Sequence, residues 1–524
     1  MASIFFSSSR RKILSCSRSP PFIFTLRRLH QPYNSLTESD IQVFSEILGH
    51  NPSLLLPASD PIVTAASTDW TGHYGPAPAR LLLRPQTTAQ VSALLRYCHE
   101  RRLPIVPQGG KTGLVGGSVP TRAHQEIILQ LQQMNQITAL DPLMGIVTCQ
   151  AGVVLQNLQD YCADQGWLVP LDLGAKGTCQ IGGNLSTNAG GPYFRKYGSL
   201  AGNVLGLEVV LADGRILDYN YRQRNNLKDN TGYKWHQLFL GSEGTLGIIT
   251  GVTLACAPLP RSKQAAFVAC ASYNQVLLVL QKARQYLGEI LAAMESMDAA
   301  IWTLVEASGR HKMPLSAETL RSDSAVLEGG PFFLLIDTHG SNADHDQEKW
   351  QTFLEAVQND ILNGVLAQDM KQYQSFWQIR ESANPTVAQL GYTYKYDVSL
   401  PIAQFQDWIQ EMRLERLGPL GRTESSLVNA NWGHILDGNL HFNVTTIGER
   451  EVQKDLVNAL EPYVFHSILK RGGSISAEHG LGQAKNHLLP SVHNEITLDW
   501  MRSMKALLDP KMILNPGKFL PVSS

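Results

Sequence analysis

The chain has 524 residues, more than one hydrophobic core usually organises, so length alone predicts several domains. Apolar residues make up 43% and charged residues 17%, which is typical of soluble globular proteins and excludes disordered, collagen-like and coiled-coil compositions. Lys and Arg number 44 and Asp and Glu 45, giving a formal net charge of −1. Without a basic field, nucleic-acid binding is not expected.

Residues 1–37 differ from the rest of the chain in charge. They are rich in serine, they contain no acidic residue, and their basic residues are Arg10, Arg11, Lys12, Arg18, Arg27 and Arg28. Because the basic residues interrupt the apolar ones, this leader is typical of a transit peptide to the mitochondrion, whereas a secretory signal needs a longer apolar run. A disordered basic tail is the alternative.

The sequence predicts no membrane span and no cysteine framework. No stretch reaches the roughly 18 apolar residues that a spanning helix requires. The seven cysteines are odd in number and contain no Cys-x-x-Cys pair. Neither disulfide bonds nor a thiolate zinc site are therefore expected, and the cysteines are interpreted as small buried apolar residues.

The first clear unit of secondary structure begins near residue 80. An apolar strand over 80–85, a helix that starts at Thr87-Thr88 and a second strand over 103–106 predict a β-α-β unit. The segment 108–118 follows directly and carries five glycines in eleven positions. Such a loop brings backbone N–H groups close to an anion.

Two further glycine-rich runs follow, at 173–191 and 241–248. Between them, strands over 203–211 and 215–217 are joined by a predicted turn at 212–214. Each glycine run alone is explained by an ordinary tight turn. Three runs together favour a cofactor site.

The common nucleotide motifs do not fit these glycines. A P-loop that ends at Gly110-Lys111-Thr112 would need its first glycine at the position of Ile105. No Gly-x-Gly-x-x-Gly follows a strand and opens a helix elsewhere. A Rossmann dinucleotide site is therefore not expected.

The three runs resemble the FAD-binding domain of the vanillyl-alcohol oxidase (PCMH) type. The motifs in order are Gly-Gly-x-Thr-Gly-Leu, Ile-Gly-Gly-Asn with Asn-Ala-Gly-Gly, and Gly-Ser-Glu-Gly-Thr-Leu-Gly-Ile. The closing Asn515-Pro-Gly-Lys518 resembles the family's C-terminal return to the flavin. Because the first run has no histidine for a covalent bond, the resemblance implies non-covalent FAD. The residues that it places at the cofactor are Gln108, Gly109, Gly110, Thr112, Gly113, Leu114, Gly117, Ser118, Gly174, Gly177, Gly182, Gly183, Asn184, Asn188, Gly190, Gly191, Glu243, Gly244, Gly247, Ile248 and Asn515.

A second domain is expected after Ala257-Pro-Leu-Pro260. Helices over 273–286 and 348–357 alternate there with strands such as 332–337, which predicts an antiparallel sheet. The chain is therefore expected to be α+β, with a two-part FAD-binding domain and an α+β substrate or cap domain. The expected parts are a leader at 1–37, an N-terminal helical segment at 38–75, the FAD-binding domain at 76–256, the substrate- and metal-binding domain at 257–500, and a returning C-terminal segment at 501–524.

A histidine-containing hairpin is the most chemically distinctive stretch. The turn expected at Asp437-Gly-Asn439 lets the chain double back and brings His434 near His441. Asn443 is two residues beyond His441 and therefore faces the same side of the returning strand.

A later loop offers a carboxylate next to a histidine, Glu478 and His479. With His434 and His441, Glu478 completes a set of three ligands that leaves a divalent ion open to substrate. From the residues alone, a structural histidine pair explains the spacing equally well.

Two cations precede this hairpin. A helix predicted over 376–384 carries Arg380 and Asn384 on one face, and a strand predicted over 391–398 carries Lys395 on the side opposite to its tyrosines. Arg380 offers a fork for a carboxylate and Lys395 a second point charge, which suits a dicarboxylate. The alternative is that both are solvated surface charges.

The hairpin and the later loop resemble the FAD-linked 2-hydroxyacid dehydrogenases, and among them the mitochondrial enzymes that act on D-2-hydroxyglutarate. Gly-His-x-x-Asp-Gly-Asn-Leu-His and Gly-Ser-Ile-Ser-Ala-Glu-His-Gly carry the resemblance, which covers nearly the whole chain from about residue 40. It implies Zn²⁺ at His434, His441 and Glu478, substrate contacts at Asn443 and His479, and carboxylate contacts at Arg380, Asn384 and Lys395. Asn384 departs from the threonine common in the family, which weakens the choice among 2-hydroxyglutarate, malate and lactate.

The resemblance also implies a reaction. The C1 carboxylate and C2 hydroxyl of a D-2-hydroxy acid would chelate the metal, His479 would act as general base, and the hydride would pass to flavin N5. The expected product of D-2-hydroxyglutarate is 2-oxoglutarate. Electron transfer flavoprotein in the mitochondrial matrix is the implied acceptor, and dimers are common in the family, so a homodimer is a further expectation.

Three alternatives stay open from the sequence. The first is a D-lactate, glycolate or D-malate dehydrogenase of the same family. The second is a zinc hydrolase whose glycine loops are structural. The third is a flavin-binding electron carrier without a substrate of its own.

Overall fold

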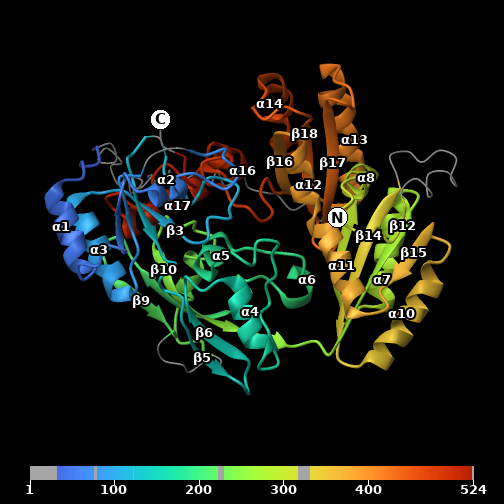
Figure 1. The fold of residues 1–524 in the computed structure, drawn as a ribbon, viewed down its shortest axis with the longest axis horizontal. Coiled ribbons are helices and arrows are strands. Elements are labelled where there is room, and N and C mark those ends of the chain that lie inside the picture. The colour runs from blue at the N-terminus through green and yellow to red at the C-terminus, as the bar shows by residue number, and fades with distance from the viewer. Residues whose placement is uncertain (1–31, 76–78, 122, 222–228, 317–330, 522–524) are drawn as a thin grey trace, which may run out of the picture.

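The computed structural model describes residues 32–75, 79–121, 123–221, 229–316 and 331–521. Most of the expected leader, residues 1–31, lies outside them. None of the helices in these ranges is long and apolar enough to cross a membrane. Figure 1 shows two lobes side by side: one holds the elements up to β10 together with C-terminal helix α17, and the other is built around the strands from β12 to β18.

The first sheet contains the predicted β-α-β unit. Its strand order is β1-β2-β4-β3, and β2 and β3 are both parallel to β4. Helix α3 begins after Thr87, whose hydroxyl accepts the N–H of Gln90 as an N-cap. The segment 38–75, expected to be helical, also contains strand β1. The elements are α1 (Glu38–Ile47), β1 (Leu55–Pro57), α2 (Pro61–Ala66), β2 (Leu81–Leu83), α3 (Thr88–Arg101), β3 (Ile105–Gln108) and β4 (Ile127–Gln130).

The second sheet is antiparallel and has the order β5-β6-β10-β8-β9. The predicted pair of strands on either side of Asp213 is confirmed as β8 and β9. One continuous apolar core joins this sheet to the first. The elements are β5 (Ile137–Asp141), β6 (Ile146–Gln150), α4 (Leu155–Ala163), β7 (Trp167–Leu168), α5 (Ile181–Thr187), α6 (Phe194–Tyr197), β8 (Val204–Val210), β9 (Ile216–Tyr219), β10 (Ile248–Ala255) and β11 (Ala257–Pro258).

The third sheet has seven antiparallel strands in the order β15-β12-β14-β13-β17-β18-β16. Alternate residues of β12 face two separate apolar cores, because helices cover both faces of the sheet. Helix α7 coincides with the predicted 273–286 and begins with a capping box between Ser272 and Gln275. The elements are β12 (Ser262–Cys270), α7 (Tyr273–Tyr286), β13 (Leu291–Met297), α8 (Ala299–Ala307), β14 (Phe332–Gly340), α10 (Ala343–Val357), β15 (Asn363–Leu366), α11 (Met370–Glu381), α12 (Ala383–Leu390), β16 (Thr393–Ser399), α13 (Phe405–Glu411), β17 (Leu427–His434) and β18 (Asn439–Thr446).

One helix prediction is wrong. The helix expected over 376–384 is interrupted at Ser382, which ends α11 and precedes α12. Pro385 explains the break, because it has no N–H to donate to the carbonyl of Glu381 and its ring would clash with that carbonyl in a continuous helix. Arg380 and Asn384 therefore belong to two different helices.

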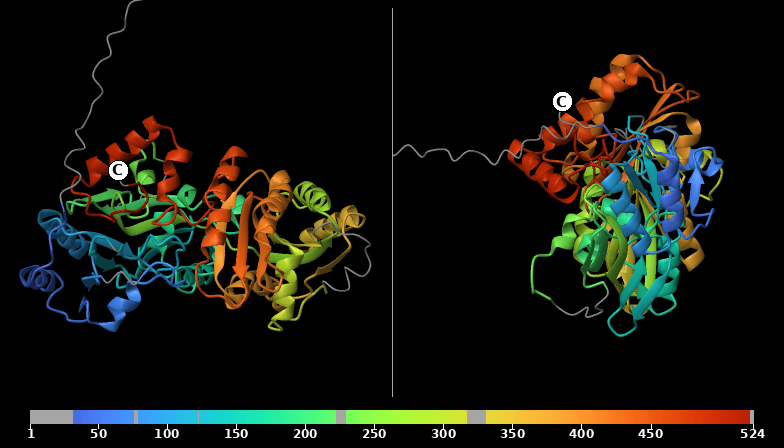
Figure 2. Two further views of the ribbon diagram at one scale, coloured as in Figure 1. Left: turned by 90° about the horizontal axis from the view of Figure 1, so that it is seen from above. Right: turned by 90° about the vertical axis from the view of Figure 1, so that its left-hand side faces the viewer.

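The C-terminal segment returns to the first lobe, as predicted. Ile105 of β3 donates its N–H to Ile513 (2.8 Å), and Asn515 donates its N–H back to Ile105 (2.8 Å). Figure 2 shows the last helices of the chain, coloured red, packed against the lobe of the N-terminal elements. The helices after β18 are α14 (Lys454–Leu460), α15 (Tyr463–Lys470), α16 (Leu489–Val492) and α17 (Glu495–Leu508). The domain bounds given above stay our proposal, while the α+β class is confirmed.

Candidate active site

All three glycine runs meet the predicted metal and substrate residues around one cavity of about 620 Å³. Both lobes contribute residues to the cavity, and its volume lies in the range of cofactor and small-molecule sites. Arg380, Asn384, Lys395, His434, His441, Asn443, Glu478 and His479 all line it. The predicted cofactor residues on its wall are Gln108, Gly109, Gly110, Thr112, Gly113, Leu114, Gly117, Ser118, Gly174, Gly182, Gly183, Asn184, Gly190, Gly191, Glu243, Gly244, Gly247 and Ile248.

Three predicted cofactor residues, Gly177, Asn188 and Asn515, do not belong to this wall. The side chain of Asn515 instead donates to the carbonyls of Gly117 (3.0 Å) and Glu243 (2.7 Å). Asn515 therefore links the first and third glycine runs by hydrogen bonds without lining the cavity itself. Direct contact of these three residues with the cofactor stays a prediction.

The wall of the cavity fits a large ligand that accepts hydrogen bonds from backbone N–H groups. A Cβ added at Gly113, Gly174 or Gly183 would meet no atom within 4 Å, so the chain there faces open space. The side-chain oxygens of Gln180 and Asn184 are buried and accept no hydrogen bond from the described residues. The open backbone suits the pyrophosphate of a flavin cofactor, and the unpaired amide oxygens suit its hydroxyl and ring N–H donors.

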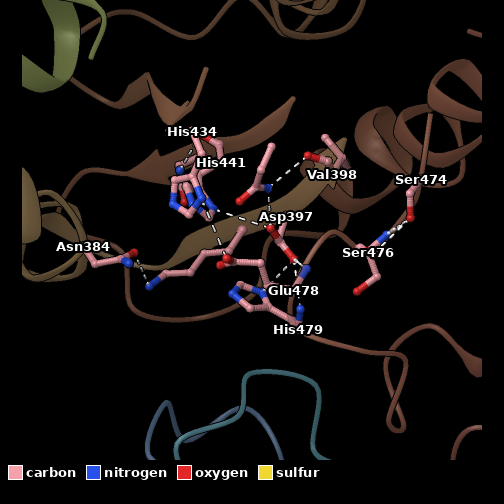
Figure 3. Close-up of polar contacts among 12 residues, drawn as sticks. Asn384, Asp397, Val398, His434, His441, Ser474, Ser476, Glu478 and His479 are labelled. Carbon is pink, nitrogen blue, oxygen red and sulfur yellow. Dashed lines mark hydrogen bonds and ion pairs between the residues drawn. The ribbon is translucent and has the colours of Figure 1, made fainter. Parts of the chain in front are cut away.

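The metal-type ligands come together as predicted. The β17–β18 hairpin brings the His434 and His441 rings to a centroid distance of 5.3 Å, and the loop after α15 adds Glu478 (Figure 3). One ligand atom from each of the three residues lies within 4.8 Å of the others. Two imidazoles and a carboxylate suit Zn²⁺, Mn²⁺ or Co²⁺, so the donor set fits the implied metal.

Sequence reasoning missed Asp397, a buried carboxylate in the middle of this cluster. Its Oδ2 accepts the backbone N–H groups of Glu478 (2.7 Å) and His479 (3.0 Å), as Figure 3 shows. Its two oxygens also lie 3.6 Å from Nδ1 of His441 and 3.7 Å from Nδ1 of His479. Asp397 therefore fixes the loop that carries the predicted base.

The environment of each ligand changes its pKa. Burial alone would lower the pKa of His434, but Glu295 and Glu478 raise it to about 9. Burial lowers the pKa of His441 well below its ordinary value, and Asp397 opposes this effect only in part. A lowered pKa favours the neutral imidazole, the form that binds a metal ion.

The two predicted cations occupy different environments. The Arg380 guanidinium is paired with the buried carboxylate of Glu295 at 2.7 Å. Lys395 has neutral partners: its ammonium donates to Oδ1 of Asn384 (3.2 Å) and lies 5.6 Å from the ring centre of Trp70. Burial lowers the pKa of Lys395 to about 8.

Glu295, Asp397 and Trp70 are the main residues that the sequence analysis did not single out. A signal existed for two of them. Glu295 is the one charged residue in a strand whose residues are all buried, and a buried carboxylate usually has a specific partner. Asp397 lies two residues from Lys395 on β16 and so shares its face. Nothing local marks Trp70, which lies in the N-terminal segment.

The chain matches two protein families. Residues 79–220 match the family described as FAD binding domain, and residues 259–519 match FAD linked oxidases, C-terminal domain. The chain is 44% identical over 492 residues to the mitochondrial D-2-hydroxyglutarate dehydrogenase of Danio rerio, covering 94% of this chain and 86% of that protein. It is 40% identical over 524 residues to a mitochondrial Schizosaccharomyces pombe protein named as a candidate D-lactate dehydrogenase, covering 97% and 96%.

Among solved structures, p-cresol methylhydroxylase with bound substrate is similar with a TM-score of 0.73, at 16% identity and covering 94% of this chain and 99% of that one. That likeness confirms the predicted PCMH-type fold, and the two family matches remove the zinc hydrolase alternative. The chain therefore belongs to the FAD-linked oxidase family that contains the mitochondrial D-2-hydroxyglutarate dehydrogenases, and it is an FAD-dependent dehydrogenase.

Proposed function

We propose that this dehydrogenase oxidises D-2-hydroxyglutarate to 2-oxoglutarate at a metal-assisted site. The observation that carries the proposal is the placement of two cations, Arg380 and Lys395, on the wall of the cavity that also holds the His434, His441 and Glu478 cluster. A substrate with two carboxylates can use the cluster at one end and the cations at the other. D-2-hydroxyglutarate is also the substrate in the names of several relatives.

Each residue then has a distinct role. When bound, FAD supplies the hydride acceptor and a divalent cation such as Zn²⁺ supplies Lewis acidity at the substrate's oxygens. Arg380, Asn384 and Lys395 bind the distal carboxylate and orient the substrate. His479 takes the proton of the C2 hydroxyl, and Asp397 keeps its ring in place.

Asn443 completes the substrate end of the cavity. It is buried, and its Nδ2 donates to the carbonyl of His441 (3.0 Å), so its amide is fixed beside a ligand residue. We propose that the amide's remaining hydrogen-bonding groups contact the substrate near C1.

We propose that the enzyme works in the mitochondrial matrix and passes electrons to electron transfer flavoprotein. The basic, serine-rich leader and the mitochondrial names of the relatives support the location. The acceptor rests on the family resemblance, as does a homodimer.

The test is anaerobic bleaching of the flavin absorbance of the purified enzyme. D-2-hydroxyglutarate is compared with D-malate, D-lactate and L-2-hydroxyglutarate, and each is repeated after removal of metal with a chelator. Metal-dependent bleaching by the D-dicarboxylates is the expected result. Bleaching that is unchanged by the chelator would refute metal assistance, and no bleaching by any acid would refute the proposal.

D-lactate, or another short acid such as glycolate, is the second candidate. Asn384 in place of the family's threonine and the name of the Schizosaccharomyces pombe relative favour it. A short acid does not need cations for a distal carboxylate. If Arg380→Ala and Lys395→Ala leave turnover of D-2-hydroxyglutarate intact while D-lactate bleaches the flavin faster, the second candidate replaces the first.

A further inference from the structure

Glu295 lies at a junction between the metal cluster and the substrate cations. The register of the sheet places it on β13 directly opposite His434 on β17. The residue is 1% exposed, and every other residue of its strand is buried as well. Burying a carboxylate costs free energy, so an apolar residue would be favoured at this strand position unless the charge had a structural or functional role.

One oxygen of Glu295 contacts Arg380 twice. Both Nε and Nη2 of the guanidinium lie 2.7 Å from Oε2. Two N–H groups on one acceptor fix the guanidinium plane, because Arg380 cannot rotate without breaking charge-assisted hydrogen bonds. The donors on its other side remain for the distal carboxylate of a substrate.

The same oxygen faces the metal cluster. Oε2 of Glu295 lies 3.8 Å from Nε2 of His434. Nδ1 of that ring lies 3.8 Å from Oε1 of Glu478 and 3.7 Å from Oδ2 of Asp437, which follows in the same hairpin. The ring therefore has Nδ1 on the side of Glu478 and Nε2 on the side of the buried carboxylate of Glu295. A metal-binding histidine commonly donates its second N–H to such a group, which sets the ring's orientation and tautomer.

We propose that Glu295 is a positioning residue that orients His434 for the metal and Arg380 for the distal carboxylate of the substrate at the same time. The inference rests on the roles given to His434 and Arg380 under the proposed function. It adds that a single buried carboxylate links the two ends of the substrate site, so that metal affinity and preference for a dicarboxylate depend on the same residue.

The decisive variant is Glu295→Gln, which keeps the side-chain shape and removes the charge. Asp298→Asn is the matched control: Asp298 is also buried, lies three residues further along and pairs with Arg413 at 3.0 Å outside the cavity. Asparagine retains the N-cap of α8 there. Glu295→Asp keeps the charge on a shorter side chain and tests for rescue.

Two readouts are measured on purified, flavin-loaded full-length protein. Competition with a zinc chelator should show a ~10–100-fold lower Zn²⁺ affinity for Glu295→Gln, with partial recovery in Glu295→Asp. At saturating Zn²⁺, the ratio of kcat/KM for D-2-hydroxyglutarate to that for D-lactate should fall, mainly through a higher KM for the dicarboxylate. Asp298→Asn should change neither readout, although it lowers thermal stability.

The inference is overturned if either readout of Glu295→Gln stays within about twofold of the wild type. A purely structural role is the result if Asp298→Asn changes both readouts to the same extent. Failure of the proposed function is distinguishable, because it would show in the wild-type enzyme as an absence of bleaching by D-2-hydroxyglutarate. The comparison of Zn²⁺ affinities would then still test the contact between Glu295 and His434.

Discussion

Replacing Lys395 by methionine is expected to separate dicarboxylate from monocarboxylate substrates. Methionine keeps the apolar stem that passes Trp70 and removes the ammonium, whose partner in the structure is the neutral amide of Asn384 at 3.2 Å. The lost interaction is therefore that with the substrate's distal carboxylate, while the protein loses no ion pair at this position.

The size of the effect follows from the chemistry of that contact. A hydrogen bond to a charged group contributes about 1.5–3 kcal/mol. At about 1.4 kcal/mol per factor of ten, kcat/KM for D-2-hydroxyglutarate should fall ~10–150-fold. D-lactate has no distal carboxylate, so its kcat/KM should stay within about threefold of the wild-type value.

The thermal stability of the Lys395→Met variant should rise although its activity falls. Burial lowers the pKa of Lys395 to about 8, which means that the fold disfavours the ammonium form present at pH 7. Removing it should raise the thermal unfolding midpoint, a common exchange between stability and function. Steady-state kinetics with both substrates and thermal unfolding of the loaded enzyme test the two parts. An equal loss with D-lactate would refute the placement of Lys395 at the distal carboxylate, and a lower midpoint would refute the conclusion that the buried ammonium destabilises the fold.

Three further predictions concern the charge of Lys395 and the loops. Because kcat/KM reports the free enzyme, its value for D-2-hydroxyglutarate should fall above about pH 8 as Lys395 loses its proton, and a profile identical to that of D-lactate would contradict this. Gly110→Ala places a Cβ 2.1 Å from the carbonyl oxygen of Thr178, so it should lower the free energy of unfolding by ~1–3 kcal/mol and reduce the flavin content. The control Gly113→Ala places a Cβ that meets no atom within 4 Å, so it should leave the stability of the protein unchanged. Thermal unfolding and the flavin-to-protein absorbance ratio of both variants test this difference. Glu243→Ala removes the acceptor of two backbone N–H groups in the loop that follows the predicted base. Each unpaired donor should destabilise the loop by ~1–3 kcal/mol, so kcat should fall. Glu243→Gln retains one acceptor oxygen, so its kcat should fall less.

The elements that the sequence predicted well are those with a strong local pattern. The helix predicted over 273–286 and the strand predicted from the alternating tyrosines at 392, 394 and 396 each depend on a pattern of neighbouring residues, and the structure has both elements as α7 and β16. The helix break at Ser382 was a different case. Apolar residues continue at helical spacing through this position, whereas the break comes from Pro385, which cannot donate a hydrogen bond to the preceding turn.

The residues that the sequence analysis missed depend on long-range pairing. Glu295 meets His434 only because β13 pairs with β17, and the two positions are far apart along the chain. Asp397 on β16 contacts His479 only because the loop after α15, which contains His479, returns to that strand. Such registers follow from the packing of the whole sheet, which no local pattern encodes.

The charges around the cluster support the proposed metal site. Three carboxylates, Glu295, Asp397 and Glu478, surround the two histidines, while Arg380 is already paired with Glu295 and only Lys395 of the two predicted cations has neutral partners. A dianionic substrate brought to these carboxylates alone would meet repulsion across short distances. A divalent ion on His434, His441 and Glu478, as proposed above, would reverse that balance at the end of the cavity where the substrate's hydroxyl has to lose its proton. Glu295 and Asp397, which sequence reasoning overlooked, thus support the proposal of a metal-assisted site over one that relies on the two cations alone.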